Sequence, residues 1–161
     1  MKQIKSLATA ALLFLAIGCD RGKHPGQIGE VAPTFTVKDA SHSINLSQYR
    51  GKTVVLNFWA SWCAPCIEEL PSLMALQKAM PNIQVLAVSI DDDDTAYQNF
   101  MKEYGVTLLS IRDGSEGANL KFGSIRVPET FAIDKNGIIR RKFISSQQWT
   151  SPEIMDFLNK L

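Results

Sequence analysis

Hydrophobic and polar residues follow patterns typical of short strands and helices along this chain. Segments 53–60 and 83–90 are near-continuous runs of aliphatic, β-branched and aromatic residues, as in strands that are covered on both faces of a sheet. The expected strands are 34–37, 43–46, 53–60, 83–90, 107–111, 129–134 and 138–144. The expected helices are 63–80, 94–104, 116–122 and one that begins at Ser151-Pro152.

The order of these elements predicts the fold class. Strand, helix, strand and helix are followed by a hairpin and a last helix, which indicates an α/β sandwich with a mixed sheet. Lys135-Asn136-Gly137 ends in the Asn-Gly pair that favours a tight hairpin turn. The short strands 34–37 and 43–46 precede this unit as an N-terminal β-hairpin. No second linker or internal repeat follows residue 31, so we expect 31–161 to form one domain.

Residues 1–18 are predicted to be an export signal. Lys2 and Lys5 precede an apolar run at 7–17 (LATAALLFLAI), and a polar stretch rich in Gly and Pro follows. As a helix, this apolar run would span about 17 Å, well short of a hydrocarbon core of roughly 30 Å. A transmembrane helix is therefore the poorer interpretation.

Two ways of processing this signal remain open. Ala16-Ile17-Gly18 fits ordinary signal peptidase, which would leave a soluble exported protein. Ile17-Gly18-Cys19 instead resembles a bacterial lipobox, in which Cys19 becomes the lipidated N-terminus. We favour lipidation because an exported protein with one unpaired thiol is unusual. The expected organisation is a signal over 1–18, a lipidated tether over 19–30, and a domain held at the outer face of the cytoplasmic membrane.

Composition narrows the function classes. Of 161 residues, 45% are hydrophobic and 20% are charged, which are globular rather than disordered proportions. The 17 basic and 16 acidic residues give a formal charge of +1, so nothing electrostatic predicts nucleic-acid binding. Three cysteines are too few for a disulfide-built scaffold or a four-thiolate zinc site.

The predicted chemistry is carried by Cys63-Ala64-Pro65-Cys66, where the buried strand 53–60 ends and a helix begins. The unpaired N–H groups of a helix N-terminus favour an anion, and the thiolate is the reactive form of cysteine. We therefore expect Cys63, the more exposed of the two, to attack a disulfide. Cys66 lies one turn further into the helix, where it can resolve the mixed disulfide.

Other interpretations of a C-x-x-C pair fit less well. A zinc site needs two more ligands, and His24 and His42 lack the spacing that zinc sites show. Covalent haem attachment needs His after the second cysteine, but Ile67 stands there. A peroxiredoxin would carry Thr where Ala60 lies. A purely structural disulfide would close too short a loop to stabilise the chain appreciably.

At these residues the chain resembles a known family. The segment 59–66 (WASWCAPC), with Pro71 beyond it, is similar to thioredoxin. Segments 32–35 (APTF) and 46–52 (LSQYRGK) resemble the membrane-tethered, extracytoplasmic TlpA/ResA/DsbE proteins of the AhpC/TSA-redoxin superfamily. The segment 127–137 (VPETFAIDKNG) is closest to the branch that serves cytochrome c maturation. Over about 31–161, the resemblance implies a thioredoxin-like fold and thiol:disulfide oxidoreductase activity.

The resemblance also implies roles for residues around the cysteines. Pro128 corresponds to the family's cis-proline, which lies against the disulfide and guides the substrate backbone. Asn57 is a departure, because thioredoxin has there a buried Asp that accepts the proton of the second cysteine. Glu69, three residues after Cys66, is expected to take that role, although helix-dipole complementarity would also explain a Glu in a first turn.

Three further features have expectations attached to them. Trp62, beside Cys63, is expected to shield the sulfur and contact partners. Glu129 is expected either to make the substrate surface acidic or to be an exposed strand charge. The acidic run 91–94 (DDDD) is better explained by a helix N-terminus than by a calcium site.

The expected function is reduction of disulfides in exported proteins, with apocytochrome c as the candidate substrate. A membrane electron donor of the thiol-reducing kind is implied by the resemblance. Apart from the redox-active pair Cys63 and Cys66, no metal or organic cofactor is expected. The alternative is a binding module or holdase that retains cysteine-containing peptides without turnover.

Overall fold

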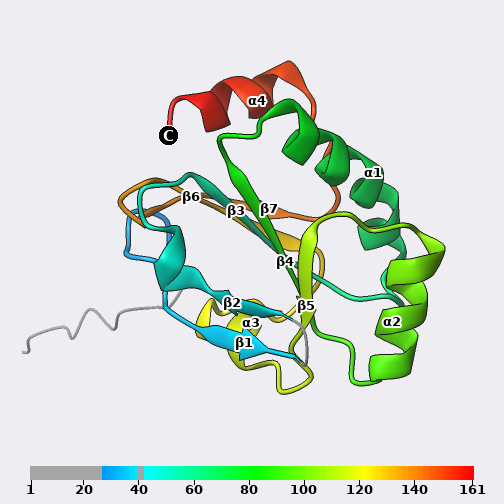
Figure 1. The fold of residues 1–161 in the computed structure, drawn as a ribbon. Coiled ribbons are helices and arrows are strands. Elements are labelled where there is room, and N and C mark those ends of the chain that lie inside the picture. Colours follow the sequence, from blue (N-terminus) through cyan, green and yellow to red (C-terminus); the bar gives the residue numbers. More distant parts are fainter. Residues whose placement is uncertain (1–26, 40–41) are drawn as a thin grey trace, which may run out of the picture.

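The centre of the molecule is a five-stranded mixed sheet with the strand order β5-β4-β3-β6-β7 (Figure 1). This computed structural model describes residues 27–39 and 42–161, so the expected signal, Cys19 and most of the expected tether lie outside the described residues. The strands are β3 (Val54–Trp59), β4 (Gln84–Ser89), β5 (Leu109–Arg112), β6 (Glu129–Ile133) and β7 (Ile139–Ile144).

The central strand β3 is buried at every one of its six residues. It pairs in parallel with β4 and antiparallel with β6. Layers of side chains cover both faces of the sheet, so β3 needs no polar face, which explains its continuous apolar sequence.

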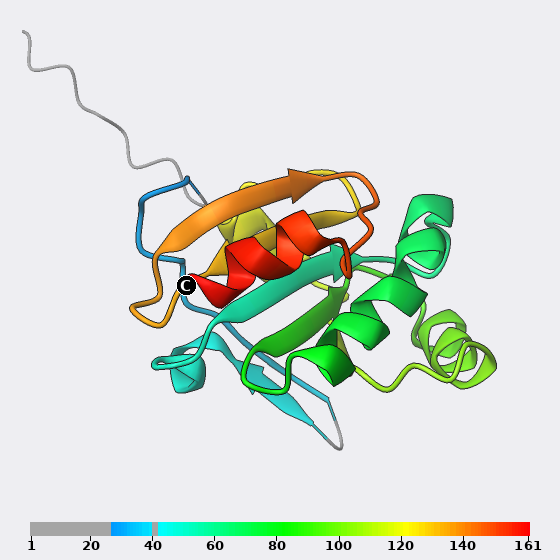
Figure 2. The same cartoon turned by 90° about the horizontal axis from the view of Figure 1, so that it is seen from above.

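Helices and loops form a layer on each side of the sheet. Figure 1 shows α1 and α4 above the sheet, and β1, β2 and α3 below it; Figure 2 views the same arrangement from above. The upper layer packs on a core shared by α1 (Ala64–Ala79), α2 (Asp94–Glu103) and α4 (Pro152–Asn159). The lower layer contains β1 (Thr36–Lys38), β2 (Ser43–Asn45), the 3-10 helix η1 (Leu46–Tyr49) and α3 (Gly117–Lys121).

The fold class predicted from the sequence is confirmed. Every expected strand and helix is present, with ends that shift by up to two residues, and β1 and β2 form a separate antiparallel hairpin. Gly105, with φ +56°, follows α2 where the sequence predicted a helix end.

The described chain begins at the end of the sheet opposite the C-x-x-C motif. Gly29 N donates to Ile139 O at 2.8 Å, and Ile139 N donates to Glu30 O at 3.0 Å. Val31 forms a bridge with Ile138, at the start of β7. The last residues of the expected tether are therefore hydrogen-bonded to the domain. Within the described residues, no helix has the length and apolar content needed to cross a membrane.

Candidate active site

Cys63 and Cys66 form a disulfide where β3 gives way to α1. Their sulfur atoms are 2.12 Å apart and their Cα atoms are 5.3 Å apart. Cys63 is the N-cap of α1, and Cys66 lies in its first turn. Cys63 N donates to Ala60 O at 3.2 Å, which fixes the turn that connects the strand to the helix.

Backbone N–H groups of the first turn of α1 are directed at Cys63. Cys66 N lies 3.3 Å from Cys63 Sγ, and Ile67 N donates to Cys63 O at 3.1 Å. A helix N-terminus with a donor on the sulfur favours the thiolate once the disulfide is reduced. We expected Cys63 to be clearly more exposed than Cys66, but both are buried: Cys63 is 5% exposed and Cys66 is 3% exposed. The distinction between the two cysteines rests instead on the Cys66 N–H, which lies at the Cys63 sulfur.

Asp91 holds the loop before Cys63. Its buried carboxylate accepts hydrogen bonds from Ser61 N at 3.0 Å and from Ser61 Oγ at 2.6 Å. Ser89 Oγ donates to the same carboxylate at 2.6 Å. Two of these donors belong to Ser61, two residues before Cys63, so Asp91 joins the end of β4 to the active-site loop.

The acidic run 91–94 therefore divides between two roles. Asp93 is the N-cap of α2 and accepts from Thr95 N at 2.7 Å, while Asp94 in the first turn pairs with Arg112 Nε at 3.1 Å. These two residues fit the predicted helix N-terminus, but the role of Asp91 was missed. Within the described part of the chain, no group of three or more His, Cys, Asp or Glu side chains could hold a metal ion.

Glu69 is buried one turn beyond Cys66, and both of its oxygens are hydrogen-bonded. Asn57 Nδ2 donates to Oε1 at 2.9 Å. Trp149 Nε1 and Gln147 N both donate to Oε2 at 3.1 Å. Burial raises the pKa of Glu69 above its ordinary value, and the three hydrogen bonds oppose this shift only in part. Such a carboxyl exchanges its proton at a higher pH than an exposed one does.

Pro128 follows a cis peptide bond with Val127. It precedes Glu129, which pairs with Phe58 near the end of β3, so Pro128 lies beside the strand end from which the disulfide loop departs. Ser145 N donates to Pro128 O at 3.1 Å, which brings the loop between β7 and α4 to the same place.

Glu129 occupies a different environment from the one expected. Its side chain is buried rather than exposed, and its carboxylate lies 3.0 Å from Lys142 Nζ of the neighbouring strand β7. The ion pair neutralises the charge, so Glu129 does not make the surface beside Pro128 acidic.

Exposed apolar side chains occur on the segments around the disulfide. Trp62, directly before Cys63, is 68% exposed. Ile125 lies in the loop before Pro128, and Ile144, also exposed, pairs with Glu129 at the end of β7. An apolar surface of this kind suits contact with a polypeptide.

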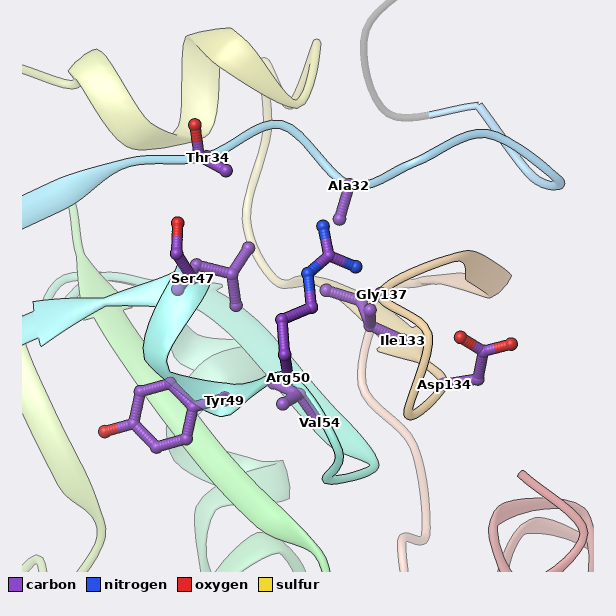
Figure 3. Close-up of a pocket in the computed structure, with 10 residues that line it drawn as sticks. Ala32, Thr34, Ser47, Tyr49, Arg50, Val54, Ile133, Asp134 and Gly137 are labelled. Atoms are coloured by element: carbon purple, nitrogen blue, oxygen red, sulfur yellow. The ribbon is translucent and has the colours of Figure 1, made fainter.

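Two small cavities lie inside the described part of the domain. One of about 10 Å³, room for about one water molecule, is lined by Asn57, Trp59 and Cys66. Another of about 10 Å³ lies at the opposite end of the sheet, where Figure 3 shows Arg50 extending between Ala32 and Gly137. Open hollows of about 680 and 610 Å³ lie elsewhere on the described domain, and neither is lined by Cys63 or Cys66. We therefore expect a polypeptide partner to meet the disulfide at the surface.

The chain is similar to known redox proteins in sequence and fold. Residues 28–142 match the model of the AhpC/TSA family. The chain is 32% identical over 161 residues to thiol-disulfide oxidoreductase ResA of Bacillus thuringiensis (strain Al Hakam). The alignment covers 98% of this chain and 91% of that protein. A DsbE-type thiol:disulfide interchange protein from Chlorobium tepidum has a similar structure, with a TM-score of 0.73, 26% identity and coverage of 83% and 94%. StoA from Bacillus subtilis shares the fold, with a TM-score of 0.66, 22% identity and coverage of 79% and 96%.

Replacement of Asp91 by Ala is expected to destabilise the loop before Cys63. It leaves the N–H and hydroxyl of Ser61 and the hydroxyl of Ser89 without their acceptor, so the free energy of unfolding falls by about 2–3 kcal/mol. Urea denaturation of the oxidised protein measures this. Asp92→Ala, at an exposed neighbour, is the matched control and is expected to change stability by less than about 0.5 kcal/mol. Equal effects of the two substitutions would contradict the role of Asp91.

Proposed function

The chain belongs to the AhpC/TSA family as a thioredoxin-like thiol-disulfide oxidoreductase of the ResA/DsbE/StoA type, and from that premise we propose that it reduces disulfides of exported proteins. One observation carries the proposal: a disulfide at a helix N-terminus lies one turn before a buried carboxyl, Glu69. This arrangement supplies a nucleophile, a resolving thiol and a proton acceptor.

The proposed reaction begins with the reduced pair. The Cys63 thiolate attacks a substrate disulfide, forms a mixed disulfide and releases one substrate sulfur as a thiolate. Cys66 then gives its proton to the Glu69 carboxylate, and the Cys66 thiolate attacks Cys63 Sγ. The second substrate sulfur leaves as a thiolate, so two electrons have passed to the substrate. A membrane dithiol donor returns two electrons to the Cys63–Cys66 disulfide.

Glu69 supports the proposed reductive cycle by giving it an internal proton acceptor. A reductase starts each cycle with Cys66 protonated, so it needs an acceptor for that proton inside the domain. Burial raises the pKa of Glu69 above its ordinary value, which suits a group that takes up a proton and later returns it. Asn57 lies on β3, where thioredoxin has a buried Asp, and its amide cannot accept this proton. Instead, Asn57 Nδ2 donates to the Glu69 carboxyl and orients it.

The proposed substrate is the C-x-x-C-H disulfide of an apocytochrome c. Haem attaches there only through free thiols, and an oxidising compartment closes such a pair. Trp62, directly before Cys63, and Pro128, beside the end of β3, are the proposed substrate contacts, whereas the Glu129 carboxylate is paired with Lys142. Glu129 therefore adds no unpaired negative charge to the surface offered to the peptide.

The proposed location is outside the cytoplasmic membrane. The sequence of residues 1–18 supports export, and Ile17-Gly18-Cys19 supports lipidation of Cys19. After removal of the signal, the remaining chain is close to neutral, so acyl chains would provide the anchoring.

Substitution of each cysteine by Ser tests the two roles. Cys63→Ser is expected to abolish disulfide reduction, because it removes the thiolate favoured by the helix N-terminus. Cys66→Ser is expected to attack and remain trapped as a mixed disulfide, which non-reducing electrophoresis detects. Equal trapping by both variants would contradict the assignment.

Multiple turnovers of wild-type protein with excess dithiol distinguish an enzyme from a holdase, which would bind peptides without consuming dithiol.

Mass spectrometry of the mature N-terminus tests the anchor. We expect diacylglycerol on Cys19, and we expect Cys19→Ala to block processing or to release the protein from membranes. An unmodified Cys19 in the wild-type protein would instead identify a soluble exported protein.

Holocytochrome c levels test the substrate. Deletion of the gene is expected to lower them strongly, and an added membrane-permeant or external dithiol is expected to restore them. Complementation by Cys63→Ser is the matched control and is expected to fail. Normal levels in a deletion strain without a redundant reductase would exclude this substrate and leave the disulfide chemistry of Cys63 and Cys66 intact.

A further inference from the structure

The β7–α4 loop supplies two of the three hydrogen bonds to Glu69. Trp149 Nε1 donates to Oε2 at 3.1 Å across 80 residues of sequence, and Gln147 N donates to the same atom across 78 residues. Asn57 Nδ2 occupies one site on Oε1 and uses its other hydrogen on Thr130 Oγ1, at 2.9 Å in each case. The two carboxyl oxygens are therefore held unequally, with both loop donors on Oε2.

The position of the Trp149 indole is fixed by its surroundings. The ring is fully buried and packs edge-on against Phe143, with ring centroids 5.0 Å apart. Trp149 N donates to Ser72 Oγ at 3.3 Å, and Ser72 Oγ lies 3.2 Å from Gln147 O. Because packing and backbone bonds already order the ring, its N–H meets Glu69 with little further loss of side-chain entropy.

A second buried tryptophan shows that this contact is specific. Trp59, at the end of β3, is also buried, but its Nε1 has no hydrogen-bond partner among the described residues. Burial of an indole in this core therefore does not by itself direct its N–H at a carboxyl, whereas Trp149 places its N–H on Glu69.

We propose that Trp149 is a positioning residue for disulfide reduction, whose indole N–H holds Glu69 so that Oε1, which accepts only the Asn57 hydrogen bond, can also accept the proton of Cys66. The proposal rests on the proposed role of Glu69 as proton acceptor. A carboxyl oxygen that accepts two N–H bonds is best suited to remain the carbonyl oxygen after protonation. The proton that leaves Cys66 Sγ then binds Oε1, on the side of Asn57, which lines the same small cavity as Cys66. The electron pair stays on Cys66 Sγ and attacks Cys63.

The groups bonded to Glu69 are neutral, so few charges compete with this effect. On α1, Cys66 is the titrating partner and Glu68 is exposed. The Glu129–Lys142 pair lies on the opposite face of β6 from Thr130, because side chains alternate along a strand. Near α4, the Arg141–Glu153 pair is exposed, and the Arg141 guanidinium lies over the Phe143 ring.

The experiment measures how pH affects the step in which Cys66 resolves a mixed disulfide. Glutathione is loaded on Cys63, and its release is followed as a function of pH for wild type and Trp149→Phe. The substitution keeps an aromatic ring but removes the donor that favours the ionised carboxyl. We expect the pH midpoint to rise by roughly one unit, which slows release about tenfold below the midpoint. A Trp149→Phe profile that coincides with that of the wild type would overturn the proposal.

Two further variants separate positioning from packing. Phe143→Leu removes the ring that packs on Trp149 but leaves the N–H, so we expect lower stability with an unchanged midpoint. Glu69→Gln is expected to remove the midpoint that depends on Glu69, and adding Trp149→Phe to it is expected to leave the remaining pH profile unchanged. A shift of the same size in the Glu69→Gln background would show that Trp149 acts elsewhere, and would overturn the proposal.

The same set distinguishes failure of this proposal from failure of the proposed function. If Glu69→Gln retains the wild-type midpoint, Glu69 is not the proton acceptor and both proposals fall. If Glu69→Gln loses it while Trp149→Phe does not move it, only the positioning role falls.

A measurement on the wild-type protein covers the case in which Trp149→Phe does not fold. The Trp149 indole proton signal in the nuclear magnetic resonance spectrum of the reduced protein is expected to shift with pH at the midpoint of glutathione release. It is expected not to shift in Glu69→Gln. A signal that stays constant across that midpoint would overturn the proposal.

Discussion

A carboxyl group can stay ionised inside a protein only if the surrounding groups replace the water that it has lost. At Glu69 this requirement determines the identity of its neighbours: an amide from β3, a backbone N–H and an indole from the β7–α4 loop. It also explains why residue 57 is Asn rather than Asp. A carboxylate there would lie about as close to Glu69 Oε1 as the amide now does, 2.9 Å, and two like charges at that distance repel. Asn57 and Glu69 therefore form a matched pair.

A second buried carboxyl supports the other side of the disulfide. Asp91 fixes the loop before Cys63, and Glu69 lies in the helix that follows it. Each belongs to a segment that leaves the sheet where β3 and β4 end, so the parallel pairing of these two strands sets the relation between both carboxyls and the sulfur atoms. Polar contacts inside the domain hold the loop and helix that carry Cys63 and Cys66. The side of the disulfide that faces solvent remains available to a polypeptide.

The elements of the fold and the cysteine pair could be predicted because their signals are local. The apolar run of β3 and the spacing of Cys63, Cys66 and Glu69 each depend on residues within one strand or about two helix turns. The contacts of Asp91 with Ser61 and of Trp149 with Glu69 join residues 30 and 80 positions apart, so no periodicity reveals them. Glu129 was assigned to the surface because the register that brings Lys142 beside it exists only in the assembled sheet.

The attachment of residues 29–31 to the start of β7 has a consequence for reach. That attachment lies at the end of the sheet away from the disulfide, and a strand of six residues separates the two ends by roughly 20 Å. If the N-terminus attaches the domain to a surface, Cys63 would therefore lie at the end of the domain that is farthest from that surface. Oxidised polypeptides in the surrounding solution could then reach Cys63 without approaching the surface to which the domain is attached. If the proposed membrane anchor and membrane dithiol donor are both correct, the donor would reach Cys63 only when the domain tilts toward the membrane. The two halves of the redox cycle would then take place in different orientations of one molecule.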